Sequence, residues 1–339
     1  MKKIIHNTPF KLESGAVIPA LELTYHTFGK LNESKSNVVW ACHALTANSN
    51  VTDWWKGLFG PDCLFDPEKY FIVCVNNLGS CYGSTGPLTA RPTGGTPLFS
   101  NFPRITIRDM ASALDIVRKE LGINKIHTLI GGSQGGQIAL EWTYAKPEQI
   151  ENLILLATNA VHSPWGIAFN ESQRMAVLAD PSFNQNTIEG GKAGLAAARA
   201  IALLSYRNYG AYSNTQNERN AEKTGNFLAS SYQRYQGKKL TERFDAYSYF
   251  TLTEAMDSHN MGRGRLSLAA ALETISAKTL VLSLEGDLLF PESEQDLLVQ
   301  HIPCALKGKI PSAFGHDGFL IETQKISKAI SAFYDHEIR

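Results

Sequence analysis

The sequence predicts an α/β fold, in which a mostly parallel sheet is flanked by helices and interrupted by an inserted helical segment. Three observations support this prediction. Short apolar runs alternate with helical stretches through the first half of the chain, which is typical of parallel strands joined by crossover helices. A Gly-x-Ser-x-Gly segment joins one of these runs to a helix. After residue 158 the alternation stops for about 120 residues and then resumes.

The expected strands are short apolar runs of the kind that is buried on both faces of a parallel sheet. They lie at 38–42, 70–75, 126–131, 152–158 and 279–284, with a shorter one near 305–310. Helices are expected where apolar residues recur at helical spacing. They lie at 105–121, at 137–145, at about 292–302 and from residue 324 onward.

The long interval before residue 279 is mostly helix-forming, with helical stretches at 193–206, 226–235 and 247–257. We expect these stretches to form a helical lid over a pocket or tunnel. The expected domains are therefore an α/β core of residues 1–160 and 265–339 and a lid of residues 161–264.

Composition argues against several classes of protein. The 339 residues include 32 basic and 32 acidic side chains, and the pI is near 7.1, which argues against a nucleic-acid-binding face. No apolar run is long enough to cross a membrane, and the N-terminal apolar stretch is too short for a signal peptide. Five cysteines without a C-x-x-C pair indicate reduced thiols and a cytoplasmic location. No zinc or phosphate motif occurs, so no metal site is expected.

Ser133 is the candidate nucleophile. It lies between Gly131 and Gly135 in the one Gly-x-Ser-x-Gly match of the chain. An apolar strand precedes it and a helix follows, and the small residues beside it permit the sharp turn of a nucleophile elbow. A serine hydroxyl needs a base to take its proton and a carboxylate to orient that base.

The base is expected to be a histidine that follows the acid in the chain. Of nine histidines, His316 is best placed, because it lies in a loop between the last strand and the closing helix. His301 falls within a helical stretch, and His336 lies near the C-terminus.

The acid is expected to leave the carboxyl end of the strand at 279–284. Asp287 is there, before a turn into the next helix, and Glu285 is the alternative. Two backbone amides should form the oxyanion hole: that of Gln134, at the start of the elbow helix, and one from the loop after the strand at 38–42. In that loop the Leu45 amide is favoured.

Nine segments, spread over nearly the whole chain, follow one family's pattern. They are 24–32, 43–46, 77–87, 102–110, 131–136, 139–142, 235–245, 288–291 and 315–320. In these segments the sequence resembles the homoserine O-acetyltransferase family of the α/β-hydrolase superfamily. The resemblance implies an α/β-hydrolase fold, an enzyme of methionine biosynthesis and a homodimer.

The resemblance also implies a two-step reaction without a bound cofactor. Ser133 takes an acetyl group from the co-substrate acetyl-CoA, CoA leaves, and the hydroxyl of L-homoserine attacks the acyl-enzyme. His316 acts as base and then as acid in each step. The expected partners are therefore small molecules.

Carried over by motif, Asp317 would bind the ammonium of homoserine, and a lid arginine would bind its carboxylate. Arg199 and Arg207 compete for that role, since a guanidinium suits a carboxylate. Arg199 is favoured because its helical stretch is otherwise apolar, and a charge placed there needs a reason.

Five positions depart from the family pattern: Gln134, Gln137, Asn260, Gly286 and Gly318. They leave the donor and the acceptor open, because relatives with this scaffold use succinyl-CoA or serine. A serine esterase or deacylase with the same three residues is another alternative, and a non-catalytic binding protein is the third.

Overall fold

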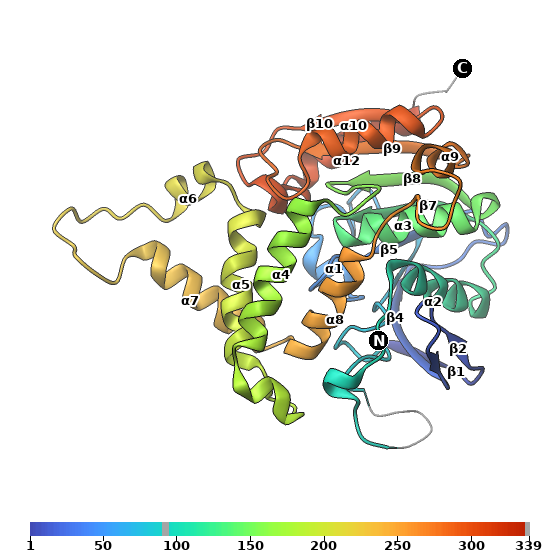
Figure 1. Cartoon of the computed structure of the whole chain (residues 1–339). Coiled ribbons are helices and arrows are strands. Elements are labelled where there is room, and N and C mark those ends of the chain that lie inside the picture. Colours follow the sequence, from blue (N-terminus) through green and yellow to red (C-terminus); the bar gives the residue numbers. More distant parts are fainter. Residues whose placement is uncertain (90–94, 336–339) are drawn as a thin grey trace.

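The computed structural model describes residues 1–89 and 95–335. At its centre lies a sheet of eight strands in the order β1-β4-β6-β5-β7-β8-β9-β10 (Figure 1). The strands are β1 (Lys2–His6), β4 (Leu21–Phe28), β5 (Val38–Cys42), β6 (Phe71–Val75), β7 (Ile126–Gly132), β8 (Ile150–Leu156), β9 (Lys278–Leu284) and β10 (Leu306–Ile310). The pairs β1–β4 and β4–β6 are antiparallel and the other pairs are parallel. The mostly parallel sheet predicted from the sequence is confirmed.

Helices cover both faces of the sheet, and each face has its own apolar core. On one face lie α2 (Ile107–Glu120), α3 (Gln134–Ala145), α9 (Leu268–Glu273) and α10 (Glu292–His301). On the other lie α1 (Val51–Trp54) and α12 (Thr323–Asp335). Strand β5 shows why: Trp40 packs into the first core, whereas its neighbours Val39 and Ala41 pack into the second, as alternation along a strand requires.

Local sequence signals set the ends of α2, which matches the predicted helix closely. Thr106 and Asp109 form a capping box, in which each side chain binds the other residue's backbone N–H. The last turn carries Arg118 and Lys119, whose charges favour the carbonyl end of a helix. The capping box therefore satisfies backbone N–H groups at the start of the helix, and the two cations complement the helix dipole at its end.

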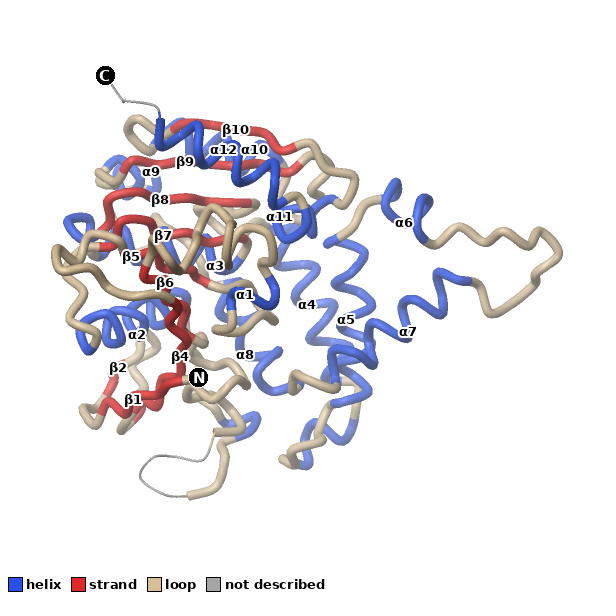
Figure 2. Tube along the Cα trace, turned by 180° about the vertical axis from the view of Figure 1, so that it is seen from behind, coloured by secondary structure: helices blue, strands red, loops and turns tan. Residues whose placement is uncertain are grey.

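Most of the chain between β8 and β9 is helical, and we call residues 164–257 the α4–α8 segment. It contains α4 (Pro164–Leu178), α5 (Lys192–Tyr206), α6 (Tyr209–Thr215), α7 (Leu228–Thr241) and α8 (Ala246–Asp257). Helices α4 and α5 pack side by side, α7 packs on α5, and the connection between α6 and α7 projects away from the body (Figures 1 and 2). The sequence predicted α5, α7 and α8 but missed α4 and α6, and α7 extends farther than expected.

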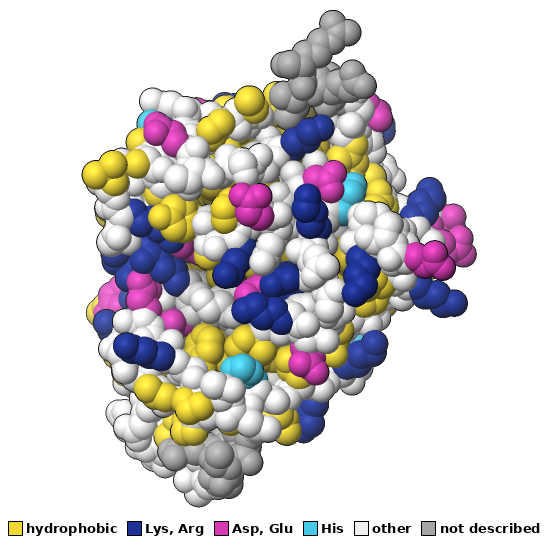
Figure 3. All heavy atoms as spheres, turned by 90° about the vertical axis from the view of Figure 1, so that its right-hand side faces the viewer, with side chains coloured by type: hydrophobic (Ala, Val, Ile, Leu, Met, Phe, Trp, Pro, Cys, Tyr) yellow, Lys and Arg dark blue, Asp and Glu magenta, His cyan; other side chains and the backbone are white. Residues whose placement is uncertain are grey.

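The face opposite the α4–α8 segment carries interspersed basic and acidic side chains (Figure 3). An ion cluster anchors part of this region to the core: Glu141, which is nearly fully buried, binds Arg108 and Arg265. In the described residues, no helix is long and apolar enough to cross a membrane. Within the same ranges no group of three or more His, Cys, Asp or Glu side chains could hold a metal ion.

Candidate active site

Ser133 occupies the sharp turn between β7 and α3. Its backbone dihedrals, φ 56° and ψ −128°, are ones that residues other than glycine adopt rarely and at a cost. Two contacts hold the turn in place. The Ser133 N–H donates to the Leu156 carbonyl at 3.0 Å, and the Thr158 hydroxyl donates to the Ser133 carbonyl at 2.8 Å. The end of β8 and the residues just after it therefore fix the strained turn, as a nucleophile elbow requires.

The turn also needs glycine at position 135. A Cβ placed on Gly135 would lie 2.1 Å from the carbonyl oxygen of Cys42, far inside van der Waals contact. The start of α3 is thus pressed against the end of β5. This close approach brings the loop after β5, which contains Leu45, next to the elbow.

We expect Gly135→Ala to lower the free energy of unfolding by about 3 kcal/mol, because the backbone must move to admit the methyl group. Activity should fall with it, since the two predicted oxyanion amides lie on the segments that would be pushed apart. Urea unfolding and initial rates measure both effects. Gly225→Ala is the matched control, because a Cβ on Gly225 meets no atom within 4 Å. Equal stability of the two variants would contradict this reading of the elbow.

His316 and Asp287 form a buried pair. The Nδ1 of His316 lies 2.8 Å from Oδ2 of Asp287, and both side chains are almost fully shielded from solvent. The other carboxylate oxygen, Oδ1, accepts the backbone N–H groups of Leu289 and Phe290 at 2.8 and 2.9 Å. Because an ionised carboxylate only accepts, the proton lies on Nδ1 of His316. This arrangement leaves Nε2 free to accept a proton from elsewhere.

The alternatives for the acid and the base lie elsewhere. Glu285 is exposed, and its backbone N–H binds the carbonyl of Ile310 in β10. His301 is the last residue of α10. His336 lies outside the described residues.

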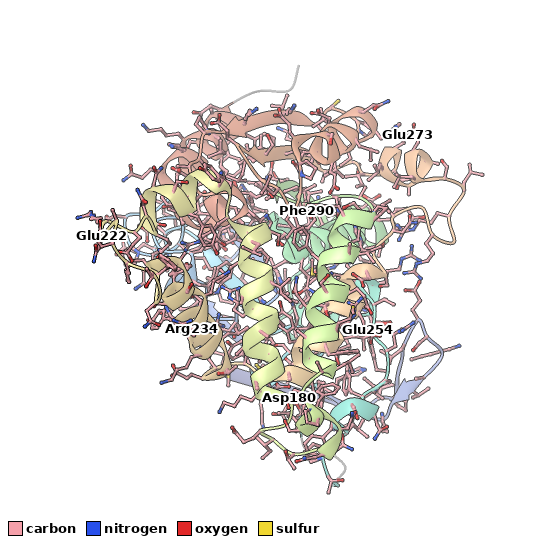
Figure 4. The ribbon with its side chains drawn as sticks, turned by 60° about the vertical axis from the view of Figure 1, so that its left-hand side comes forward. Asp180, Glu222, Arg234, Glu254, Glu273 and Phe290 are labelled. Carbon is pink, nitrogen blue, oxygen red and sulfur yellow. The ribbon has the colours of Figure 1, made fainter. Side chains whose placement is uncertain are left out.

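Three aromatic rings surround the imidazole of His316. Phe290 stacks on it with ring centroids 5.2 Å apart, Phe319 meets it edge-on at 5.2 Å, and Tyr206 lies at 5.7 Å. In Figure 4, Phe290 lies near the ends of α4 and α5 that meet the core. The Phe290 ring and its backbone N–H therefore act on the two members of the pair together, the ring on the histidine and the N–H on the aspartate.

A cavity of about 350 Å³ opens in front of His316. Five of the eight predicted site residues line it: Leu45, Ser133, Arg199, His316 and Asp317. The other three do not line it, although Asp287 contacts His316. They are Gln134, Arg207 and Asp287. The structure thus brings together a serine and a histidine that are 183 residues apart in the sequence (316 − 133).

The backbone amides of Leu45 and Gln134 are available as donors. Among residues 1–89 and 95–335, neither N–H has an acceptor in the protein. The preceding loop is held by His43, which accepts the Asn77 N–H at Nε2 (3.0 Å) and lies 2.9 Å from the Ala44 carbonyl through Nδ1. Complete burial lowers the pKa of His43 to about 4, so this histidine is neutral and structural.

The two candidate arginines have different surroundings. Arg207 donates from Nε to Oδ2 of Asp317 at 3.1 Å, and its guanidinium lies over the ring of Tyr232. Arg199 lines the cavity and lies 5.3 Å from the ring of Tyr206. In the described part of the chain, Arg199 has no carboxylate partner. Arg199 thus presents an uncompensated charge to the cavity, and Arg207 is paired with the carboxylate predicted to bind an ammonium.

Similar proteins identify the family. Residues 37–323 match the family model of the alpha/beta hydrolase fold. The chain is 49% identical over 323 residues to the homoserine O-acetyltransferase of Cyclobacterium marinum, an alignment that covers 95% of this chain and 92% of that protein. The chain belongs to the homoserine O-acetyltransferase family.

Solved structures related to this family extend the comparison. The homoserine O-acetyltransferase of Bacillus anthracis superposes with a TM-score of 0.91 at 26% identity and covers 100% of this chain and 98% of its own. An acetylester hydrolase of Corynebacterium glutamicum superposes with a TM-score of 0.87 at 25% identity, covering 99% of this chain and 96% of its own. Acetyltransferases and acetylester hydrolases therefore share this fold. The fold alone does not separate the two activities, so the residues of the site must do so.

Several residues that line the cavity were not predicted from the sequence. They include Tyr206, Lys239, Arg243 and Phe319. Two of them are close in sequence to predicted site residues. Tyr206 directly precedes Arg207, and Phe319 lies three residues after His316. Lys239 and Arg243 both lie in one of the family-like segments, residues 235–245.

Burial also shifts the pKa values of two histidines that do not line the cavity. His162 and His259 are almost fully buried, and burial lowers their pKa values to about 4 and about 3. His43, His162 and His259 thus stay neutral in the folded protein, each with a pKa below the value of about 6.5 expected in the unfolded chain. As the pH falls from about 6.5 towards 4, the unfolded chain binds protons before the folded protein does.

We therefore expect the free energy of unfolding to fall in that window, by about 2 kcal/mol at pH 5 for each such histidine. Urea unfolding at pH 7 and pH 5 measures the effect. His162→Gln, which removes one ionisable group, should reduce the difference between the two pH values. Equal stability at pH 7 and pH 5 would show that these histidines do not stay neutral on folding.

Proposed function

We propose that the protein transfers an acetyl group from acetyl-CoA to the hydroxyl of L-homoserine, a step of methionine biosynthesis, through an acyl-Ser133 intermediate. The 49% identity to a homoserine O-acetyltransferase over almost the full length of both chains carries this proposal. The buried His316–Asp287 pair beside Ser133 supports the mechanism.

In the first half-reaction, Nε2 of His316 takes the proton of the Ser133 hydroxyl as its oxygen attacks the thioester carbonyl. Negative charge then develops on the carbonyl oxygen, where the amides of Leu45 and Gln134 would donate hydrogen bonds. When the tetrahedral intermediate collapses, the carbon–sulfur bond breaks and the CoA sulfur receives the proton from His316. Asp287 keeps the imidazole oriented and stabilises its charged form.

The second half-reaction repeats these steps with homoserine. His316 takes the proton of the homoserine hydroxyl, the new ester bond forms, and the Ser133 oxygen leaves with the proton. Homoserine is a zwitterion, so a closed pocket must pair both of its charges. Asp317 would bind the ammonium and Arg199 the carboxylate, which places the hydroxyl near the acyl-serine.

We also propose that residues 1–160 and 265–339 form the catalytic core and that residues 161–264 form a lid. The position of Arg199 on α5 supports this division, because the residue proposed to bind the carboxylate then comes from the lid. The family resemblance further implies a homodimer, and the cysteine pattern implies the cytoplasm. Sedimentation of the purified protein tests the dimer, and its distribution in fractionated cells tests the location.

An acetyl esterase is the second candidate, favoured by the likeness to the acetylester hydrolase. Water would then replace homoserine in the second half-reaction. Steady-state kinetics with acetyl-CoA and succinyl-CoA, each tested with homoserine, serine and no acceptor, separates the possibilities. The proposal requires O-acetylhomoserine to be the main product. Acetate release that homoserine does not suppress would favour the esterase.

A further inference from the structure

Besides Arg199, two basic side chains in the lining of the cavity have no acidic partner among the described residues. Lys239 lies in the last turn of α7, and Arg243 follows two residues after that helix ends. Both are exposed, and both line the same cavity as Ser133 and His316. Considering residues 1–89 and 95–335, neither forms an ion pair. The cavity lining therefore carries these two cations outside any ion pair, together with one acidic side chain, Asp53, that also forms none in the described residues.

The guanidinium of Arg243 is held in one orientation. Its Nη1 donates to the Thr46 carbonyl at 2.5 Å and to the Tyr82 hydroxyl at 2.7 Å. Both contacts use the same nitrogen, so the edge formed by Nε and Nη2 has no acceptor in the described part of the chain. That edge is the one with which arginine binds a carboxylate or phosphate through two parallel hydrogen bonds.

We propose that Arg243 and Lys239 bind the phosphate groups of the CoA part of the acyl donor. The inference rests on the proposed function, which makes a phosphate-bearing thioester the first substrate. A fixed guanidinium edge and a nearby ammonium are suited to a diphosphate, which presents several oxygens and more than one negative charge. The acceptor carries a single carboxylate, and Arg199, on α5, is already proposed to bind it.

The phosphates do not change during acyl transfer, so these contacts are the same in the bound substrate and in the transition state. Contacts of that kind lower KM without raising kcat. A phosphate subsite therefore differs from the catalytic residues in its kinetic effect. It should also act on the donor alone, because the acceptor enters after CoA has left.

The test compares two donors that differ only beyond the reacting thioester. S-acetylpantetheine carries the same thioester arm as acetyl-CoA but has no phosphate groups. Lys239→Gln should raise the KM for acetyl-CoA about tenfold, the loss expected for one charge-assisted contact. It should leave the KM for S-acetylpantetheine and for homoserine unchanged. Lys238→Gln is the matched control, because Lys238 lies in the same last turn of α7 but lines the groove between α5 and α7.

Arg243→Gln should raise the KM for acetyl-CoA at least as much. Loss of the contact to the Thr46 carbonyl will lower kcat with both donors by the same factor, so the ratio of the two KM values isolates the phosphate effect. The proposal is overturned if Lys239→Gln and Arg243→Gln leave that ratio as in the wild type. Failure of the wild type to transfer acetyl from either donor to homoserine is a distinct result, which overturns the proposed function and this inference with it.

Discussion

Incubation of the protein with acetyl-CoA, without an acceptor, is expected to add one acetyl group to the peptide that contains Ser133. The strained backbone of Ser133 holds its side chain at the cavity beside His316, and His316 is already oriented by Asp287. Initial rates with varied donor and acceptor should give parallel double-reciprocal lines, because CoA leaves before homoserine enters. Mass spectrometry of the trapped acyl-enzyme checks the first point directly.

Ser133→Ala, Asp287→Asn and His316→Ala should each reduce kcat by about 10³-fold or more. Their combination should cost little beyond the largest single effect, because the three residues act as one unit. Glu285→Gln is the control, since Glu285 lies two residues before Asp287 but is exposed. Intersecting lines together with no acyl-enzyme would exclude this mechanism.

The sequence predicted the central part of the fold because that part follows simple rules. Strands β7, β8 and β9 are buried on both faces, so their apolar runs are visible without any partner. The elbow is visible because the close approach of Gly135 to Cys42 excludes every side chain. In the buried strands and in the elbow, the residues that the local structure favours are also the ones that the tertiary packing requires.

Helix α4 was missed because its buried face is largely polar. Its buried residues are Gly166, Asn170, Gln173, Arg174 and Val177, which do not form an apolar stripe. Their partners come from distant segments: Asn170 and Arg174 both bind Asp257, at 2.8 and 2.5 Å. A helix stabilised by side chains more than 80 residues away leaves little periodic signal in its own sequence.

The sequence predicted residues of the candidate site, but not which of its charged side chains form an ion pair with each other. The order of Ser133, Asp287 and His316 follows from the strand order, because each leaves the same edge of the sheet. The ion pair between Arg207 and Asp317 joins residues 110 positions apart, and no spacing rule relates them. The sequence could name both arginines, whereas only the folded chain shows which of them is already paired.

Because Arg207 is paired with Asp317, Arg199 is the arginine expected to bind the carboxylate of homoserine. Arg199→Ala should lower kcat/KM for homoserine about 100-fold or more, because the substrate carboxylate would lose a charged partner inside the cavity. Acyl-enzyme formation from acetyl-CoA should change only a few-fold, since the donor has no carboxylate to place there. Arg234→Ala is the control, because Arg234 is an exposed arginine of α7 (Figure 4) that lies outside the cavity.

Asp317→Asn should impair acceptor use to a similar degree, and Arg207→Ala should do so less, because Arg207 acts through Asp317. A double-mutant cycle of Arg207 and Asp317 should show coupling: once Asp317 is replaced, loss of Arg207 should have little further effect. Hydrolysis of the acyl-enzyme should rise in Arg199→Ala, because water can enter the space left by homoserine. If Arg207→Ala abolished acceptor use while Arg199→Ala did not, the carboxylate would bind Arg207 and the ion pair would have to open on substrate binding. If none of the three substitutions affected acceptor use, homoserine would not be the acceptor, and water would take its place.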